Sequence, residues 1–500
     1  MAFVTTLFLI GIPIAAAYYF LFGRGRRLSD DIPGPSGVPL LGNALQLDQN
    51  KPNESLFSWA KQFGAVFKFN LFGEDILVVN SVEGLREMLV TKSSDFSGRP
   101  SYYRINYFIN DFDVVFHDVG PRWSLIKKTC MAELKQVGEN LKKLEDMTVD
   151  ILQDLSEDLA VYKNEPVDLR EQLHGAVAMI TFSLVFGRKP TKEDHTEMIY
   201  LDQAMSELST PTGPGATLDL MPWLRFFGNA TFQTMKELKP RVYTFYQKQL
   251  RLTRAEYRQG DVNCVVDGLL RERQKYVSDH NRPEVTLDNI DSTSRDLLTA
   301  GVLTTSSALY YTISCIVTNP EVQKRAYQDI VDVIGERTPT LKDRSSLPYI
   351  ESMIFEVLRL MSHVPVSIPH KTVTDTTLLG YNIPKNTQVW ANLWYVHHDA
   401  SLWKDPWKFK ADRFLDEEGK LVLADHPLRK QLFAFGAGRR VCAGEVMARN
   451  RLFLFIVFLL QRFQFLPYDG EIINCDPRAF QLGIVLRPDS YRVRVVQRKS

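Results

Sequence analysis

The sequence carries almost no excess of either charge and very little cysteine. Its 60 lysines and arginines stand against 59 aspartates and glutamates, a formal net charge of +1 over 500 residues. This balance excludes a protein that binds nucleic acid through its overall charge, so any basic site must be local. The five cysteines are odd in number and far apart: Cys130, Cys264, Cys315, Cys442 and Cys475. They form neither a disulfide framework nor a C-x-x-C zinc pattern, so we expect reduced thiols in a body that faces the cytosol.

Internal repeats and low-complexity tracts are also lacking. Hydrophobic residues make up 45% of the chain and charged residues 24%. These are ordinary values for a globular protein, and they exclude a disordered, collagen-like or many-span membrane protein. A chain of 500 residues exceeds the usual size of a single core, so we expect several domains or one unusually large helical body.

The first of two long uncharged stretches lies at the N-terminus, from Ala2 to Phe22. As a helix it would be about 31 Å long, close to the thickness of a bilayer core. Arginines at positions 24, 26 and 27 follow it directly. Because positive residues favour the cytoplasmic side, we predict a transmembrane anchor over residues 2–22 with a lumenal N-terminus. The alternative is a cleaved signal peptide, but there the positive charges precede the apolar stretch and a small-residue cleavage site follows it.

A connector follows the predicted anchor. Three prolines and two glycines fall within the seven residues 33–39. This composition disfavours a helix and favours a stiff, extended segment. We therefore predict a basic and Pro/Gly-rich linker over residues 23–45. This linker holds the body at a fixed orientation relative to the membrane.

Strand patterns in the body are few and peripheral. Amphipathic segments of helical length dominate the long middle, from Glu83 to Leu360. The stretches rich in β-branched and aromatic residues are Ala65–Leu71 and Asp75–Val79 around Gly73, Thr376–Val389 around a turn at 384–387, and the alternating Tyr491–Val495. We predict a mainly α fold with small peripheral β-sheets.

The second uncharged stretch, Leu297 to Val317, contains seven serines and threonines. It is long enough to span a membrane, but this hydroxyl content favours a long helix buried in the globular body. The hydroxyls could simply bond to carbonyls one turn earlier in the helix. The functional alternative is that the cluster around Gly301 and Thr304 opens the helix locally and admits a ligand and water.

The most specific pattern is Phe435–Gly444, which reads F-x-x-G-x-R-x-C-x-G. Its glycines leave backbone N–H groups free to approach the sulfur of Cys442, and the apolar run after it predicts a helix that begins just beyond the cysteine. Both features favour the thiolate that ligates a metal. Arg440 can reach an anion beside that metal. A lone cysteine on such a turn would be read as structural, but the complete pattern resembles the haem-binding signature of the cytochrome P-450 family.

Further elements of the same family resemble segments elsewhere in the chain. Glu356 and Arg359 form an E-x-x-R pair on one helix face, which is a weak signal by itself. Arg413, in Ala411–Phe414, resembles the second-arginine motif with alanine in place of the usual proline. The resemblance implies that these three residues form a structural charge cluster that fixes the haem loop.

The resemblance also implies a set of haem-binding residues. Trp123 and Lys127 match the W-x-x-x-R element with lysine for arginine, which keeps the charge but loses bidentate geometry. Arg99 and His370 resemble further ligands of the haem propionates, and Phe435 begins the haem signature. The alternatives are a surface arginine at 99 and a capping histidine at 370.

Because the resemblance covers essentially the whole chain, it implies the cytochrome P-450 fold, with residues 46–500 as a haem-thiolate catalytic domain. The cofactor is haem b with the Cys442 thiolate as axial ligand. The anchor resembles that of the microsomal branch, which implies the endoplasmic reticulum membrane, contact with membrane lipid, and electrons from an NADPH-dependent flavoprotein reductase. No nucleic acid is expected. Asp219–Leu224 and the His370 region resemble the group of steroid 17α-hydroxylases and drug-metabolising enzymes, so the lipophilic substrate is steroid-like or a xenobiotic.

One departure from the family pattern bears on the reaction. The family carries A-G-x-[Asp or Glu]-T in the buried helix, where the acid and the alcohol help to deliver protons to dioxygen. This chain keeps Thr304, the expected catalytic residue, but has Leu303 in place of the acid. A monooxygenase is favoured because the thiolate is present. A haem-thiolate isomerase or lyase acting on a peroxide, and a haem protein that binds a lipid without turnover, remain the alternatives.

Basic residues concentrate around the signature cysteine. Between positions 429 and 451 there are six, against the single acid Glu445. A solvated surface would explain them, but their position also suits the docking of an acidic electron donor close to Cys442. Arg449 and Lys430 are the expected rim charges.

Overall fold

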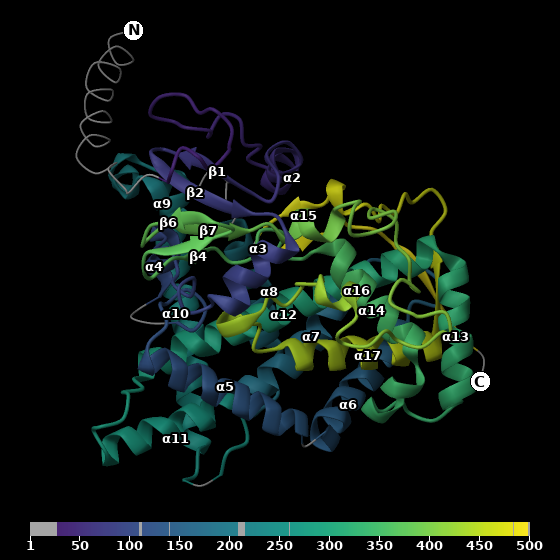
Figure 1. Cartoon of the computed structure of the whole chain (residues 1–500). Helices are drawn as coiled ribbons and strands as arrows, with labels where there is room; N and C mark the ends of the chain where they lie inside the picture. Colours follow the sequence, from purple (N-terminus) through teal and green to yellow (C-terminus); the bar gives the residue numbers. More distant parts are fainter. Residues whose placement is uncertain are drawn as a thin grey trace. The chain divides into compact units, whose positions relative to one another are not determined.

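The computed structural model describes residues 28–109, 113–139, 141–208, 216–259, 261–483 and 485–498. The predicted anchor over residues 2–22 lies outside the described residues, as does the start of the linker. The chain divides into two compact units, whose elements Figure 1 labels. Among the described residues, the first unit holds 28–102, 364–402 and 436–441, and the second holds 103–363, 403–435 and 442–498.

The first unit is built on a four-stranded sheet of order β1-β2-β7-β4. Its strands are β1 (Val66–Leu71), β2 (Glu74–Val79), β4 (His370–Lys371) and β7 (Gln388–Ala391), and its other elements are α2 (Pro52–Phe63), α3 (Val82–Arg86), the π-helical η1 (Glu87–Thr91), α15 (Leu393–His398) and the 3₁₀ turn η4 (Gly438–Arg440). The predicted first hairpin is confirmed, since β1 and β2 are antiparallel with Leu71 opposite Glu74. Gly73 has φ 93° in the connecting turn, a value that suits glycine.

The second predicted strand region contains one more turn than expected. Its hairpin, β5 (Thr376–Leu378) with β6 (Tyr381–Ile383), closes at Leu379 and Gly380, which have φ 48° and 85°. The expected turn at 384–387 is present but leads from β6 into β7, a strand of the other sheet. Backbone N–H groups of Asn386 and Thr387 donate to Thr372, and this ties the second turn to the start of the segment.

The second unit is mainly helical, as predicted. Its helices are α4 (Tyr103–Phe108), α5 (Pro121–Glu139), α6 (Leu141–Ala160), α7 (Arg170–Phe186), α8 (Lys192–Leu208), α9 (Ala216–Leu220), α10 (Ala230–Glu256), α11 (Val265–Ser278), α12 (Leu287–Thr318), α13 (Pro320–Ile334), α14 (Pro348–Met361), α16 (Pro427–Lys430) and α17 (Glu445–Arg462). Short 3₁₀ turns are η2 (Pro222–Phe227), η3 (Leu341–Ser346) and η5 (Pro477–Ala479). Its small sheets are β3-β11-β8 and β10-β9, built from β3 (Pro166–Val167), β8 (Phe463–Pro467), β9 (Gln481–Leu482), β10 (Leu486–Arg487) and β11 (Val493–Gln497).

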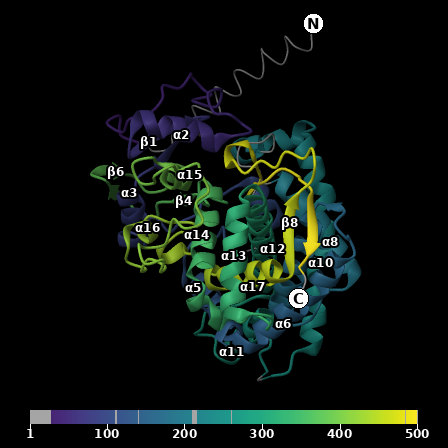
Figure 2. The same ribbon diagram turned by 90° about the vertical axis from the view of Figure 1, so that its right-hand side faces the viewer.

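Helix α12 is the central element of the second unit. It begins with a capping box in which Thr286 and Asn289 satisfy each other's backbone N–H groups. In Figure 2, α13 and α14 run beside α12, and α17 crosses them. Among the described residues α12 alone is long and apolar enough to span a membrane, but most of it is buried in protein. The prediction of a buried interior helix is therefore confirmed.

Of the two alternatives for the hydroxyl cluster, local opening of the helix near Gly301 is wrong. Helix α12 is continuous from Leu287 to Thr318. A Cβ at Gly301 would lie 2.8 Å from the methyl group of Thr181 on α7. Gly301 therefore allows α12 and α7 to pack closely. The contact does not interrupt α12.

Candidate functional site

Cys442 lies at the end of a closed loop in front of α17. Its backbone N–H donates to the carbonyl of Phe435 at 2.9 Å. Phe435 itself packs against the main hydrophobic core of the second unit, so the loop is held at its base. Helix α17 begins at Glu445, just beyond the cysteine as predicted. The Gly444 N–H donates to the Cys442 sulfur, and the residue is exposed, so the sulfur is open to a ligand.

The protein around Cys442 disfavours the free thiolate. The residue as a whole is exposed, but protein atoms surround its sulfur and keep water away from it. This desolvation raises the pKa of the thiol above its ordinary value. The Gly444 N–H, Lys127 and Arg451 oppose the rise but do not reverse it. The predicted effect of the loop's N–H donor is present, since Gly444 lowers the pKa, but burial outweighs it. A bound metal cation deprotonates a coordinating thiol directly, so the metal supplies what the loop does not.

Arg451 is a charged group near Cys442 that the sequence analysis did not single out. It lies on α17 with 3% of its surface exposed, and its guanidinium donates to the Thr181 hydroxyl at 2.7 Å. Burial lowers its pKa to about 10, and Cys442 acts in the opposite direction. Since a buried cation requires an anion, the Cys442 thiolate is a natural counter-charge for Arg451. The available sequence signal was an arginine directly before the apolar run of residues 452–460 in α17.

Trp123 and Lys127 contact each other on α5. The Trp123 indole N–H donates to the Val114 carbonyl at 2.9 Å, and the ring is buried. The Lys127 ammonium lies 5.1 Å from the centre of that ring, a distance typical of a cation–π contact. Lys127 also lowers the pKa of Cys442, so its charge reaches the cysteine.

One face of α12 stays accessible. Ala300, Thr304 and Ser307 are partly or fully exposed, and their spacing of four and three residues places them on one side of the helix. The Thr304 hydroxyl donates to the Ala300 carbonyl at 2.8 Å. This is the bond to a carbonyl one turn earlier in the helix that the sequence allowed for. The neighbouring Leu303 is only 5% exposed.

Asp296 is a second residue that the sequence analysis missed. It lies on α12 eight residues before Thr304, where its carboxylate accepts hydrogen bonds from the backbone N–H groups of Val114 and Val115. Burial raises its pKa well above the ordinary value, and the nearby Asp113 raises it further. The signal in the sequence was an acid at the very edge of the uncharged stretch.

In the first unit, the structure brings Arg99, His370 and Arg440 together. Arg99 donates to the carbonyls of Ile368 and Pro369, both at 2.8 Å. Arg440 donates to the Ser97 carbonyl at 2.9 Å, and the His370 ring nitrogen Nδ1 lies 2.7 Å from the Phe96 carbonyl.

Backbone pairing brings these residues to one place. Gly98 and Lys371 exchange two hydrogen bonds of 2.9 and 3.0 Å. A Cβ at Gly98 would lie 2.7 Å from the Lys371 carbonyl oxygen, so only glycine fits there. Burial holds the pKa of His370 well below its ordinary value, and Arg99 and Arg440 lower it further. The histidine is thus neutral between two guanidinium groups, an arrangement that suits an anionic ligand.

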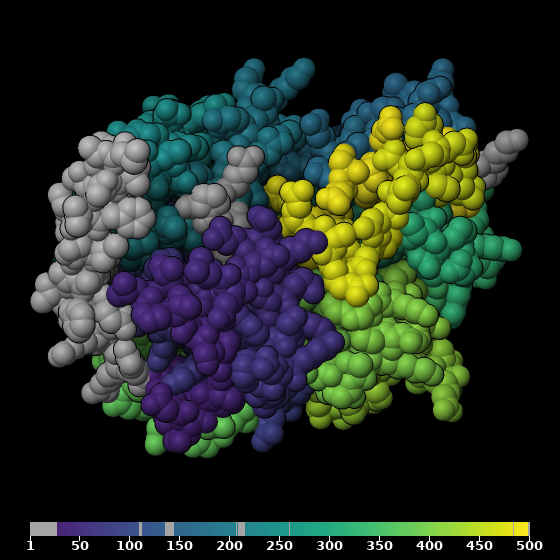
Figure 3. Space-filling model, turned by 90° about the horizontal axis from the view of Figure 1, so that it is seen from above, coloured from purple at the N-terminus to yellow at the C-terminus, as the bar shows by residue number. Residues whose placement is uncertain are grey.

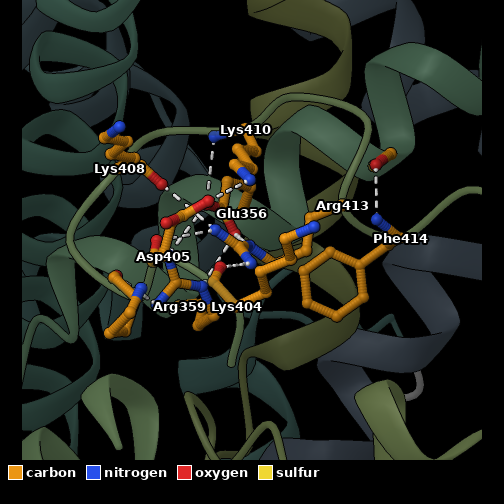
Figure 4. Close-up of polar contacts among 10 residues, drawn as sticks. Glu356, Arg359, Lys404, Asp405, Lys408, Lys410, Arg413 and Phe414 are labelled. Carbon is orange, nitrogen blue, oxygen red and sulfur yellow. Dashed lines mark hydrogen bonds and ion pairs between the residues drawn. The ribbon is translucent and has the colours of Figure 1, made fainter. Parts of the chain in front are cut away.

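The pair Glu356 and Arg359 lies buried on α14, and Arg413 joins it from a distant segment. The Glu356 carboxylate accepts from Arg359 at 2.7 and 2.8 Å and from Arg413 at 2.8 Å (Figure 4). Both Glu356 and Arg359 have 0% of their surface exposed. The two positive charges are therefore neutralised in part by one carboxylate, away from water.

The same three side chains also hold the loop before Phe414. Arg413 donates to the carbonyls of Lys404 and Lys408, and Arg359 donates to that of Pro406. Glu356 accepts from the backbone N–H of Lys410 at 3.1 Å. Figure 4 shows Glu356, Arg359 and Arg413 beside Lys404, Lys408 and Lys410 of this loop. The cluster therefore fastens residues 404–410 to α14, and no proline is needed at Ala411.

The six basic residues around Cys442 do not form one exposed group. Arg449 is ion-paired with Glu351 at 3.2 Å and lies 4.5 Å from the ring centre of Phe355. Arg429 stacks on the same ring, and Arg451 is buried. The expectation that Arg449 is a rim charge is wrong, because a carboxylate on α14 engages it. Lys430, at the end of α16, is exposed.

The comparison with protein families settles the class of the protein. Residues 32–495 match the family described as Cytochrome P450, so the chain belongs to the cytochrome P450 family, as predicted. It is an enzyme, a haem-thiolate monooxygenase, whose cofactor is haem held by a cysteine thiolate and whose electrons come from NADPH through a reductase.

Individual relatives cover almost the whole chain. It is 31% identical to cytochrome P450 1A1 of Mesocricetus auratus over 489 residues, 94% of this chain and 91% of the relative. It is 31% identical to cytochrome P450 1A1 of Rattus norvegicus over 462 residues, 89% and 86% of the two chains. For the protein of that name from Limanda limanda the identity is 30% over 483 residues, 93% and 91%.

The residues present fit such a cofactor. An accessible sulfur with one N–H donor suits an iron ligand. The pair of guanidinium groups at His370 suits carboxylates.

Proposed function

We propose that this protein is a membrane-anchored monooxygenase that inserts one atom of dioxygen into a lipophilic substrate, steroid-like or xenobiotic. The observation that carries the proposal is the accessible Cys442 sulfur, held in a closed glycine-rich loop at the start of α17. Cys442 would supply the sulfur that holds the haem iron. The haem, when bound, supplies the oxygen-activating chemistry, because a thiolate ligand favours cleavage of the O–O bond.

The other roles are assigned to the chain's own residues. Arg99, Arg440 and His370 bind haem carboxylates, with Trp123 and Lys127 as further contacts and Phe435 at the base of the loop. Thr304 contacts oxygen and passes protons, because its hydroxyl lies on the accessible face of α12. The buried trio of Glu356, Arg359 and Arg413 supports this arrangement. Residues 46–500 form the catalytic domain on the cytosolic side of the endoplasmic reticulum membrane, with residues 2–22 as anchor and 23–45 as linker.

Reconstitution tests the reaction class. The full-length chain in lipid vesicles with an NADPH-dependent flavoprotein reductase should consume NADPH and yield a hydroxylated product from a panel of steroids and planar aromatic compounds. An isomerase or lyase would instead rearrange an added organic peroxide without NADPH. A lipid-binding protein without turnover would do neither. Either of the last two results would overturn the proposal.

Leu303 supplies a prediction on proton delivery. The side chain is 5% exposed, so Leu303→Glu places a carboxyl in a dry site, where desolvation raises its pKa and a cost of about 2–4 kcal/mol in unfolding free energy is expected. At neutral pH most of this carboxyl then stays protonated and donates a proton near Thr304. Product formed per NADPH should rise about twofold or more, and peroxide release should fall.

Leu303→Gln is the matched control, since it has nearly the same shape and hydrogen-bonds but does not titrate. It should lose similar stability without the gain in product per NADPH. Coupling and peroxide are measured together with urea unfolding for both variants. An equal coupling ratio in wild type and a folded Leu303→Glu variant would show that Leu303 acts only in packing.

Lys430 supplies a prediction on the electron donor. It is exposed at the end of α16, close in sequence to Cys442. Lys430→Glu should slow reduction by the reductase about two- to tenfold at low salt, and the difference should shrink as salt rises, because rim charges act on the association rate. Lys163→Glu, an exposed charge reversal outside residues 429–451, is the control. Stopped-flow reduction with equal rates for both variants and wild type at every ionic strength would refute the docking role.

A further inference from the structure

Two cysteines that have no part in the proposed haem site meet at the C-terminal end of α12. Cys315 lies on the last turn of that helix and has 0% of its surface exposed. Cys475 lies between β8 and η5 and is partly exposed. The Thr318 hydroxyl joins the two cysteines, since it lies 3.1 Å from the Cys475 sulfur and 3.2 Å from the Cys315 carbonyl. A buried cysteine thus lies beside a second cysteine that is partly exposed.

Side chains of α12 hold the segment that carries Cys475. The Tyr311 hydroxyl donates to the backbone carbonyl of Cys475 at 2.9 Å. The Thr318 hydroxyl lies 3.1 Å from the Cys475 sulfur and 2.9 Å from the Ser314 carbonyl. Because Tyr311, Ser314 and Thr318 all belong to α12, the segment that carries Cys475 is held against that helix.

Cys475 is also the most acidic thiol among the cysteines whose pKa shifts. Its hydrogen bond with Cys315, helped by Thr318 and Ser314, lowers its pKa to about 7 against the effect of burial. By contrast, burial and Asp296 raise the pKa of Cys130 to about 12. Since the thiolate is the nucleophile, this lowered pKa favours reaction at Cys475 over the other thiols.

We propose that Cys475 and Cys315 are a modification site, a thiol pair that hydrogen peroxide oxidises to a disulfide. The Cys475 thiolate attacks one peroxide oxygen, the O–O bond breaks, and hydroxide leaves to become water, so Cys475 becomes a sulfenic acid. The Cys315 sulfur then attacks the Cys475 sulfur, the S–O bond breaks, and the oxygen leaves as a second water with the Cys315 proton. The two thiols lose two electrons and one peroxide becomes two waters. If the protein is the monooxygenase proposed above, peroxide that it releases without forming product would provide the oxidant locally.

The disulfide would join α12 to the chain that leads into the β9–β10 hairpin. That hairpin already contacts α12, since the Ser307 hydroxyl lies 3.4 Å from the Leu486 carbonyl, one turn beyond Thr304. The C-terminal segment, yellow in Figure 3, forms part of the molecular surface. Cys475 itself is partly exposed. Oxidation would therefore restrain the hairpin next to the accessible face of α12.

Mass spectrometry of the full-length, haem-loaded protein tests the proposal. The protein is treated with graded hydrogen peroxide, quenched with catalase, alkylated and digested without reductant. The peptide that links Cys315 to Cys475 should be the main cross-linked product, and dithiothreitol should remove it. In Cys315→Ser, dimedone labelling of Cys475 should rise severalfold over wild type, because the sulfenic acid forms but no thiol resolves it. Cys475→Ser should show neither product.

Cys264→Ser is the matched control, a buried cysteine at the start of α11, and it should leave the linked peptide unchanged. If Cys315→Ser does not fold, Cys315→Ala replaces it, and the wild-type measurement stands without either variant. Absence of the linked peptide in wild type, or equal oxidation of Cys130 and Cys475, would overturn the proposal. Added peroxide requires no turnover, so this test is independent of whether the monooxygenase assignment holds.

Discussion

Cys442→Ala is expected to abolish the absorption band of the thiolate-ligated, carbon-monoxide-bound reduced protein. The Cys442 sulfur is the proposed iron ligand, and alanine has no donor atom to replace it. The band should fall to background, and catalysis should fall with it. The measurement is a reduced carbon-monoxide difference spectrum of wild type and variant at equal protein concentration.

The change should leave the fold almost intact. The Cys442 side chain is exposed and its sulfur accepts one hydrogen bond, from Gly444, so its loss should cost within about 1 kcal/mol of unfolding free energy in the haem-free protein. Serine replacements of the other four cysteines are the controls, and each should keep the band. A normal thiolate band in Cys442→Ala would refute the assignment of the ligand.

Glu356→Gln is expected to destabilise the protein more than the substitutions at Leu303, Lys430 or Cys442. The carboxylate is fully buried and accepts from two arginines and one backbone N–H. Glutamine leaves two guanidinium charges without their anion in a dry site, and removing one partner of a buried ion pair costs about 3–5 kcal/mol. Urea unfolding of the full-length protein should show this loss, and less haem-loaded protein should be recovered.

The matched control is Glu418→Gln. Glu418 pairs with Lys420 at 2.6 Å, but both side chains are more than 70% exposed. A pair in water contributes only about 0–1 kcal/mol, so this variant should unfold close to wild type. Similar stability for both variants would show that the buried cluster adds nothing beyond a surface pair and that it does not fasten the 404–410 segment.

The Cys442 thiol and the Cys475 thiol have opposite pKa shifts for one physical reason. A thiolate forms easily only where hydrogen bonds offset the loss of water around the sulfur. At Cys442 burial outweighs the Gly444 N–H and the cations, whereas at Cys475 the hydrogen bonds outweigh burial. Hydrogen bonds therefore favour the thiolate at Cys475, whereas burial opposes it at Cys442.

Short-range patterns were sufficient to predict much of this protein. The β1–β2 hairpin followed from a strand pattern around Gly73, and the signature 435–444 placed both the Cys442 loop and the start of α17. The hydroxyl-rich stretch was correctly expected to form a buried helix. In each case the information lies within about twenty consecutive residues, because turn chemistry, periodicity and loop geometry are local.

The tertiary structure alone decided which charges and thiols are available. Arg449 forms an ion pair with Glu351, which lies far from it in the sequence. Lys430 stays exposed. Gly301 permits close packing against Thr181 and does not open α12. Cys315 and Cys475 meet although 160 positions separate them. Burial and hydrogen bonding depend on which distant segments pack together, and so the acidity of a thiol and the exposure of a charge are properties of the folded chain.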